Sequence, residues 1–178
     1  MFPILETERL ILREIKMEDA ADLFAYFSNE EVMRYYGQET FTAIQQVETL
    51  IGHFSENYRN QRGIRWGIQI KGHAELIGSL GLNNLMMSNK RAEIGYEIHS
   101  TYWRNGYTSE AVKKVISYAM KELKLNRLGA MVYVENKASN NLVKKLGFQH
   151  EGVLRKYYVQ NGKAYDTNVY SIVTEGYM

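Results

Sequence analysis

Apolar and polar residues alternate along many segments of the chain, and this alternation is typical of β-strands that bury one face. Seven segments are expected to form strands, namely residues 9–15, 66–70, 75–82, 91–99, 127–134, 152–160 and 163–173. Gly72 separates the second segment from the third, and Asn161-Gly162 separates the last two, so each pair is expected to form an antiparallel hairpin. The pattern therefore predicts a mostly antiparallel sheet of about seven strands.

Apolar residues recur every three or four positions in the segments between, as they do along one face of an amphipathic helix. Helices are expected over residues 17–27, about 43–60 and 138–147, and a longer helix is expected after Gly106. The longer helix has an apolar stripe formed by Ala111, Val112, Val115, Ile116, Ala119, Met120 and Leu123. Gly147 is well placed to end the last helix in a left-handed conformation, which glycine adopts easily.

The order of these elements predicts one α/β domain over residues 1–178. A length of 178 residues agrees with a single domain, and no linker, internal repeat or low-complexity segment divides the chain. Residues 91–134 form a strand–helix–strand unit, and such a unit can pair its two strands in parallel.

The charge and the cysteine content exclude several classes of protein. A net charge of +2 is too small to attract nucleic acid by its field alone. No apolar run approaches the roughly 20 residues of a membrane span, and the opening MFPILETERL is not a signal peptide, so no membrane partner is expected. The chain has no cysteine, which excludes disulfides and thiol chemistry and agrees with a cytoplasmic location. The four histidines show no metal-binding spacing, so no metal is expected.

The stretch YWRNGYTSEA, residues 102–111, places a lone glycine among polar side chains directly before the long helix. The first N–H groups of a helix and the positive end of its dipole favour an anion such as a phosphate. Gly106 lets a ligand approach the backbone closely, and Arg104 adds a cation. Thr108 and Ser109 add hydroxyl donors. An ordinary turn with a helix N-cap is the alternative, because neither established glycine-rich phosphate motif is present.

Four segments taken together are more specific than this stretch alone. They are TERLILREIKMEDA (7–20), SNEEVMRYYG (28–37), AEIGYEIHSTYWRNGYTSEA (92–111) and VENKASNNLVKKLGFQHEGVLR (134–155). In this order they resemble the GNAT superfamily of N-acetyltransferases, and more narrowly its RimJ/RimL-like branch of ribosomal-protein N-acetyltransferases. The pairing of WxxGYxxEA with ENxxSxxLxxKLGFxxEG is the specific part of a resemblance that runs from about residue 7 to about residue 173.

The resemblance implies the GNAT fold, in which a twisted, mostly antiparallel sheet of about seven strands is flanked by about four helices. A splayed pair of central strands in this fold admits acetyl-coenzyme A (acetyl-CoA). The implied activity is direct transfer of the acetyl group to a primary amine within a ternary complex, since the chain has no cysteine to carry the acetyl group. A non-catalytic acyl-CoA-binding module is the alternative from another class of protein.

The resemblance also implies which residues bind acetyl-CoA. Its pyrophosphate is expected at Arg104, Asn105, Gly106, Tyr107, Thr108 and Ser109. The strand backbone through Glu97, Ile98 and His99 is expected to pair with the pantetheine arm. Asn136 is expected to hydrogen-bond that arm, and Ser139 to line the far wall. Helix capping is the alternative role for Asn136 and Ser139.

Attack of an amine on a thioester requires a base for the amine proton, donors for the oxyanion, and an acid for the departing thiolate. An α-amine titrates near ~7.7–8.0 and lysine near ~10.4, so deprotonation at neutral pH costs about 1 kcal/mol and about 4–5 kcal/mol, respectively. An α-amine therefore asks little of a base, and the resemblance to the RimJ/RimL-like branch implies a protein N-terminal α-amine as the preferred acceptor. A small amine, such as a polyamine, an amino acid or an antibiotic, is the alternative.

Many members of the superfamily protonate the thiolate with a tyrosine four residues before the glycine of the LGF element, where this chain has Val143. The resemblance offers Tyr158 and Ser139 as substitutes, and Tyr157 exchanges with Tyr158 if a bulge shifts the strand. Tyr158 is preferred, because a tyrosine with a pKa near ~10 is a better acid toward a thiolate than a serine. A buried tyrosine with a satisfied hydroxyl is the structural alternative.

Glu93 and Glu97 are the candidate bases, because residues four apart share one face of a regular strand. Either carboxylate can instead be a solvent-facing strand residue, and Glu97 is also a candidate contact for a cationic acceptor. His99 is the only histidine near this chemistry. Strand edges near residues 159–173 allow either a monomer or a homodimer.

Overall fold

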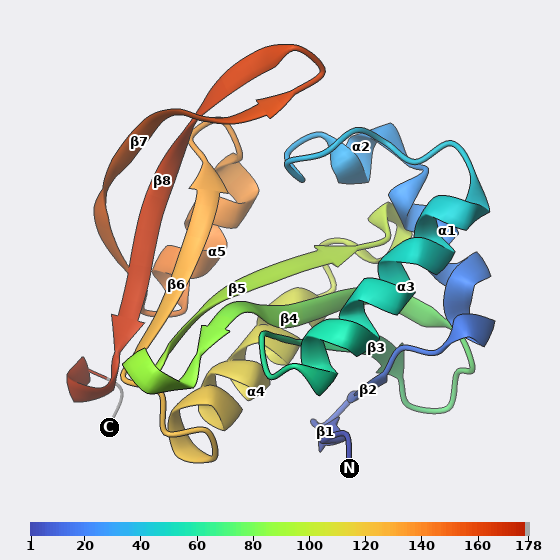
Figure 1. Cartoon of the computed structure of the whole chain (residues 1–178), viewed down its shortest axis with the longest axis horizontal. Helices are drawn as coiled ribbons and strands as arrows, with labels where there is room; N and C mark the ends of the chain where they lie inside the picture. The colour runs from blue at the N-terminus through green and yellow to red at the C-terminus, as the bar shows by residue number, and fades with distance from the viewer. Residues whose placement is uncertain (177–178) are drawn as a thin grey trace.

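The computed structural model describes residues 1–176, which form one eight-stranded sheet (Figure 1). The strands are β1 (Leu5–Glu6), β2 (Leu10–Glu14), β3 (Ile64–Ile70), β4 (Leu76–Met86), β5 (Arg91–Ile98), β6 (Arg127–Tyr133), β7 (Gln149–Gln160) and β8 (Lys163–Val173). Their order in the sheet is β1-β2-β3-β4-β5-β6-β8-β7. Among the described residues, β5 and β6 make the one parallel pair. The expected mostly antiparallel α/β fold is confirmed, with the two-residue β1 as the strand that the pattern does not predict.

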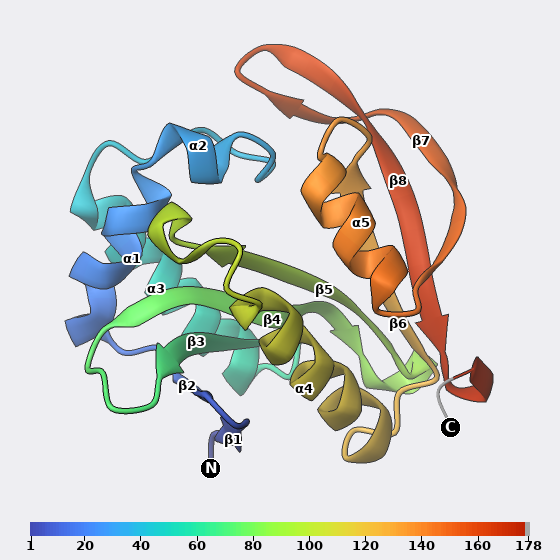
Figure 2. The ribbon, with the colours of Figure 1, turned by 180° about the vertical axis from the view of Figure 1, so that it is seen from behind.

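Helices cover both faces of the sheet. They are α1 (Ala20–Phe27), α2 (Glu30–Met33), α3 (Ile44–Arg59), α4 (Tyr107–Lys121) and α5 (Lys137–Lys145). α4 and α5 lie on one face, and α1 and α3 lie on the other (Figures 1 and 2). The hydrophobic pattern predicts all of them except α2, whose four residues are too few to show a helical period.

The apolar stripe of α4 packs against the sheet largely as predicted. Its buried residues are Ala111, Val112, Val115, Ile116, Ala119 and Met120. They share a core cluster with Trp66 and Leu80 of the sheet. Leu123 differs from the prediction, because α4 ends at Lys121 and Leu123 lies half-buried in the turn that follows. A second cluster, which includes Phe27, fills the space between α1, α3 and the other face.

The parallel pair β5 and β6 splits into a fork. Residues 91–93 of β5 pair with residues 127–129 of β6, and no further pair forms beyond Glu93 and Gly129 within the described residues. β6 instead continues along β8, which it pairs as far as Tyr133 and Thr167. The splayed strand pair expected from the family resemblance is therefore confirmed.

Asn140 holds the free end of β6 in place. Its side-chain amide donates to the carbonyl oxygens of Tyr133 (2.9 Å) and Asn136 (2.8 Å). Its Oδ1 accepts from the Tyr170 hydroxyl (2.6 Å) and the Asn168 amide (2.8 Å). These hydrogen bonds join β6, α5 and β8, so the fork stays open without help from β5.

The closing hairpin turns as predicted, with Asn161 and Gly162 at φ angles of 51° and 73°. β7 is longer than expected because it begins at Gln149, and its register shifts twice along β8. One shift lies between Leu154 and Tyr158, which is a bulge of the kind considered for the two tyrosines. Tyr157 is 52% exposed and Tyr158 is half-buried, so Tyr158 faces the interior.

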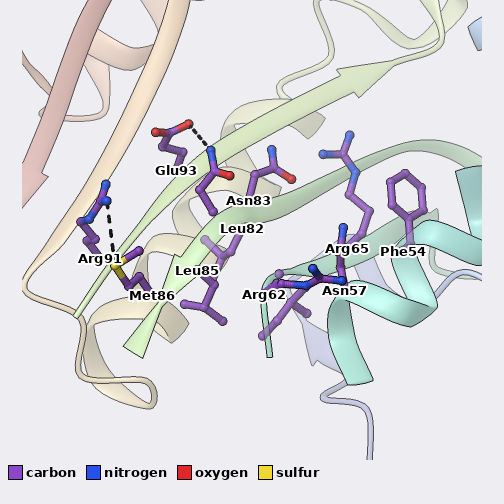
Figure 3. A pocket seen from close by; sticks show the side chains of 13 residues that line it. Phe54, Asn57, Arg62, Arg65, Leu82, Asn83, Leu85, Met86, Arg91 and Glu93 are labelled. Carbon is purple, nitrogen blue, oxygen red and sulfur yellow. Dashed lines mark hydrogen bonds between the residues drawn. The ribbon is translucent and has the colours of Figure 1, made fainter. Parts of the chain in front are cut away.

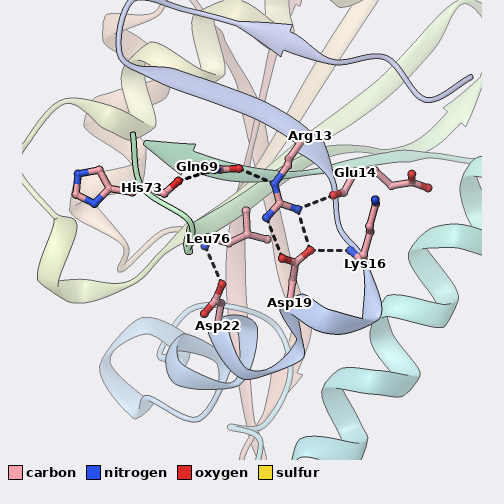
Figure 4. A network of polar contacts seen from close by, with 8 residues as sticks. All are labelled: Arg13, Glu14, Lys16, Asp19, Asp22, Gln69, His73 and Leu76. Atoms are coloured by element: carbon pink, nitrogen blue, oxygen red, sulfur yellow. Dashed lines mark hydrogen bonds and ion pairs between the residues drawn. The ribbon is translucent and has the colours of Figure 1, made fainter. Parts of the chain in front are cut away.

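A polar network fixes the start of α1 against the sheet (Figure 4). The Arg13 guanidinium donates to both carboxylate oxygens of Asp19 at 2.9 Å, and Asp19 also accepts from the Lys16 N–H at 2.8 Å. Arg13 also donates to the Gln69 side chain of β3 at 2.6 Å. Asp19 therefore closes the 3-10 turn Met17–Asp19 that leads into α1 and anchors it to β2 and β3.

Candidate active site

A cavity of about 680 Å³ opens at the wide end of the fork. Six of the predicted site residues line it, namely Glu97, Ile98, Arg104, Thr108, Asn136 and Ser139. Tyr96 and Glu97 are neighbours in β5 and therefore point to opposite faces of the sheet, yet both line the cavity. The cavity lies between the separated ends of β5 and β6, and residues of α2, the loop before α4 and α5 complete its wall.

The loop from β5 to α4 turns through two left-handed residues, Arg104 (φ 62°) and Gly106 (φ 78°). Gly106 is the N-cap of α4, where glycine tolerates a left-handed backbone without strain. The first N–H groups of the helix, those of Tyr107, Thr108 and Ser109, have no acceptor within the helix. Arg104 and Thr108 add a cation and a hydroxyl to the cavity wall, so the loop suits a phosphate.

Arg9 and Glu110 tie this loop to the start of β2. Arg9 Nη1 donates to the Asn105 carbonyl oxygen (3.0 Å), and its guanidinium lies 4.5 Å from the centre of the Tyr107 ring. Arg9 Nε donates to Glu110 at 2.7 Å, and the Thr7 hydroxyl donates to the same carboxylate. Partial burial opposes ionisation, but these bonds hold the pKa of Glu110 below its usual value. The sequence motif does not predict these contacts, because about 100 residues separate Thr7 and Arg9 from the loop and Glu110.

Fewer backbone groups of β5 face the fork than the family resemblance implies. Backbone groups alternate between the two edges of a strand, and the His99 N–H donates to Ile77 on the β4 side (2.8 Å). Ile98 therefore faces the fork, but its carbonyl oxygen already accepts from the Trp103 indole (2.9 Å). The His99 ring caps the following turn through the Thr101 N–H. The fork edge is thus presented by Tyr96 and Ile98, and His99 turns away from it.

Asn136 and Ser139 both cap α5 and line the cavity. Asn136 Oδ1 accepts from the Ser139 N–H at 3.2 Å, which is the capping bond that sequence reasoning held as the alternative. The Ser139 hydroxyl lies 2.6 Å from the hydroxyl of Tyr96, which crosses the fork from β5. Burial raises the pKa of Tyr96 to about 12. Sequence reasoning missed Tyr96, because a tyrosine in an alternating strand gives no functional signal.

Glu97 is buried and paired. Its carboxylate accepts from Arg65 Nη2 and from the Ser79 hydroxyl, and Arg65 Nε donates to the same hydroxyl at 3.0 Å. Burial by itself would lower the pKa of Arg65, but the Glu97 charge outweighs it and the pKa is raised. Burial and the same negative charge raise the pKa of Tyr36, which also lines the cavity.

Glu93 lies in a different cavity, of about 600 Å³, on the face covered by α3 (Figure 3). It accepts from the Asn84 side-chain amide at 3.1 Å. Gly81 and Gly95 pair with each other in the adjoining strands, and the Arg65 side chain packs where their side chains would otherwise lie. Arg65 also lines this cavity and its partner Glu97 lines the cavity at the fork, so the two cavities adjoin at the Arg65–Glu97 pair.

Tyr158 lies on the closing hairpin and does not line the cavity at the fork. Its ring is 5.5 Å from that of Tyr133, and it packs beside Gly37 in the loop after α2. Burial raises the pKa of Tyr158, with smaller contributions from Tyr157 and Glu93. Val143 is fully buried one turn after Ser139 on α5.

Gln160 joins the hairpin to the loop after α2. Its Oε1 accepts from the Gly37 N–H and the Tyr133 hydroxyl, both at 3.1 Å. Its Nε2 donates to the Met33 carbonyl oxygen at 2.7 Å. This Gln160 clasp connects the closing hairpin to the loop after α2, and Figure 1 shows the two segments close together beyond the wide end of the fork.

Residues 1–176 contain no group of three or more side chains placed to hold a metal ion. None of the helices in this range is both long and apolar enough to cross a membrane.

The family model for the acetyltransferase (GNAT) domain matches residues 9–149. The chain belongs to this family. It is 56% identical over 173 residues to the uncharacterized N-acetyltransferase YoaA of Bacillus subtilis, with 97% of this chain and 98% of YoaA covered. The match to family and relative shows that this GNAT protein is an N-acetyltransferase.

More distant relatives of this GNAT enzyme carry more specific names. The putative ribosomal N-acetyltransferase YdaF of Bacillus subtilis is 30% identical over 177 residues, which cover 97% of this chain and 96% of YdaF. Spermidine N(1)-acetyltransferase of Escherichia coli is 28% identical over 152 residues, which cover 85% of this chain and 79% of that protein. A solved structure of a probable acetyltransferase, 28% identical, superimposes with a TM-score of 0.87 over 97% of this chain and 98% of its own.

Proposed function

We propose that this N-acetyltransferase moves the acetyl group of acetyl-CoA to the α-amine of a protein N-terminus. The cavity at the fork is the observation that carries the proposal. It joins the phosphate-suited loop before α4, the open edge of β5, the start of α5 and the segment of α2 with the loop after it. A donor bound along the fork can therefore meet an amine that arrives from the α2 side.

On the donor side, the first N–H groups of α4 with Arg104 and Thr108 would bind the pyrophosphate. The backbone at Tyr96 and Ile98 would pair with the pantetheine arm in the manner of an added strand. Asn136 is suited to the same arm, because its oxygen is used in capping and its amide group remains on the cavity wall. Acetyl-CoA would supply the activated acetyl group, and these residues would align it.

On the acceptor side, Glu93 is the better candidate base. Its carboxylate accepts one hydrogen bond, from Asn84, and faces a cavity large enough to hold water and part of an acceptor. Glu97 is held by Arg65 and Ser79, so removing a proton through Glu97 would require the buried pair to break. Tyr158, on the hairpin side of the site, would assist proton transfer near the attacking amine.

Two arguments support a protein N-terminus as the acceptor, namely the low cost of deprotonating an α-amine and the name of one relative. An α-amine is deprotonated at neutral pH at a cost of about 1 kcal/mol, so a carboxylate acting through water suffices. YdaF, which is named a putative ribosomal N-acetyltransferase, supports a protein N-terminus. The E. coli relative named for spermidine supports the second candidate, a small polyamine.

Thiol release from acetyl-CoA with two acceptor pools would test the proposal. One pool contains N-terminal peptides of ribosomal proteins, and the other contains polyamines, amino acids and aminoglycosides. We expect turnover with the peptides, and a lower kcat for the Tyr158→Phe variant. Turnover with small amines alone would overturn the acceptor class and keep the chemistry. Acetyl-CoA binding without turnover in either pool would identify a binding module.

A further inference from the structure

A pair of hydroxyl groups spans the fork on the face that carries α4 and α5. Tyr96 reaches across from β5 and Ser139 from α5, and their oxygens are 2.6 Å apart. Both residues line the cavity together with Asn136. β5 and β6 are no longer paired at this level, so the hydrogen bond crosses the open part of the fork.

The pair lies one helical turn from the position where the family resemblance would place a phenol. Val143 occupies that position, and its side chain is fully buried in the core cluster against which Tyr96 packs. α5 therefore supplies no acid at residue 143. A phenol from β5 instead reaches α5 at Ser139, one turn earlier.

Other candidate acids are less well placed. Tyr158 packs with Tyr133 and Gly37 on the hairpin side and is absent from the wall of the cavity at the fork. Glu97 reaches the cavity but is paired with Arg65. Tyr96 and Ser139 both lie on the cavity wall, and the hydrogen bond between their hydroxyls provides a path for a proton.

We propose that Tyr96 and Ser139 form the acid relay that protonates the departing thiolate. As the N–C bond forms and the C–S bond breaks, the C–S electron pair stays on sulfur, and sulfur takes the proton of the Ser139 hydroxyl. Ser139 regains a proton from Tyr96, and the tyrosinate takes one from solvent. Solvent also receives, through the base, the proton that the amine loses. One proton leaves nitrogen and one reaches sulfur, so the step balances.

The environment of Tyr96 suits this role, because burial keeps its phenol protonated across the neutral and mildly alkaline range. The relay rests on the proposed acetyl transfer, but it does not depend on which amine is the acceptor. It can therefore be tested with any amine that turns over.

Kinetics of Tyr96→Phe, Ser139→Ala and the double variant would test the relay. We expect each single change to lower kcat about 100-fold, with little change in the KM for acetyl-CoA. The double variant should be no slower than the slower single variant, because both residues serve one proton path. Tyr118→Phe is the matched control, since Tyr118 is a partly buried tyrosine that packs on Trp66, away from the cavity. Single effects that multiply, or that change KM alone, would overturn the relay.

Two further measurements keep the test decisive if a variant folds poorly or no acceptor is found. The relay predicts that wild type binds CoA about tenfold more tightly than desulfo-CoA, which lacks the sulfur, and that Ser139→Ala removes this preference. Equal binding of the two ligands by wild type would overturn the relay. Ser139→Thr, which keeps the hydroxyl, should retain most of the kcat of wild type. A folded Ser139→Thr variant as slow as Ser139→Ala would overturn the relay.

Discussion

Glu93 and Glu97 lie on the same face of β5, yet their surroundings give them different roles. The four-residue spacing predicts their shared face but not that Arg65, 32 residues earlier, neutralises one of them. Such a partner is set by the register of β3, β4 and β5, which sequence spacing does not specify. For the same reason the sequence did not indicate Tyr96, whose partner Ser139 belongs to α5.

Glu97→Gln should destabilise the protein by about 3–5 kcal/mol, because it leaves the buried Arg65 guanidinium without its counter-charge. Urea unfolding would measure the loss. Glu56→Gln is the matched control, since Glu56 pairs with Arg62 on the exposed surface and its removal should cost less than about 1 kcal/mol. Unchanged stability with lost turnover would instead make Glu97 a participant in the chemistry.

Glu93→Gln should lower kcat about 100-fold while leaving acetyl-CoA binding unchanged, because the change removes the proposed base and keeps the size of the side chain. Steady-state thiol release and calorimetry would measure the two effects. Glu6→Gln is a suitable control, as Glu6 is an exposed carboxylate paired with Lys71 and lines neither cavity. A variant as active as wild type would exclude Glu93 as the base.

At the scale of elements, the start of α4 depends on the segment before β2. The motif at residues 102–111 predicts the loop and its proposed ligand, and Gly106 has the left-handed backbone that such a loop requires. Thr7 and Arg9 complete the loop from the other end of the chain. A local motif cannot show contacts of this kind, because they form only when the sheet brings distant segments together.

Arg9→Ala should weaken CoA binding about tenfold, equivalent to ~1.4 kcal/mol, because the Asn105 carbonyl and the Tyr107 ring lose their support. Titration calorimetry would measure the change. Arg62→Ala, an exposed arginine on the opposite face, should bind CoA as wild type does. Equal affinities for wild type and Arg9→Ala would show that the loop keeps its shape unaided.

The Arg127–Glu151 pair, which joins β6 to β7, should make stability depend on pH in the acid range. Hydrogen bonds from Arg127 and Ser171 lower the pKa of Glu151 to about 2. An unfolded glutamate titrates near ~4.3, so the stabilisation is complete above that pH and disappears as pH falls toward about 2. Glu151→Gln should therefore lose less stability than wild type between pH 6 and pH 3, as measured by urea unfolding. Parallel losses in the two proteins would contradict this assignment.

For the whole molecule, the hydrophobic pattern was sufficient to predict the mixed sheet, four of the helices and the parallel unit at residues 91–134. It could not predict how far β5 and β6 stay together, because strand separation depends on side-chain bonds such as those of Asn140. The proposed site depends on that separation. The sequence therefore identifies many residues of the proposed site but does not predict how they are arranged around the fork.

The Gln160 clasp gives the fork a property that neither of its strands has. The paired residues 91–93 close the narrow end of the fork, and Gln160 bridges the hairpin and the loop after α2 at the wide end. The width of the opening is therefore fixed at both ends. The wide end can open further only when the hydrogen bonds that join Gln160 to Met33 and Gly37 break.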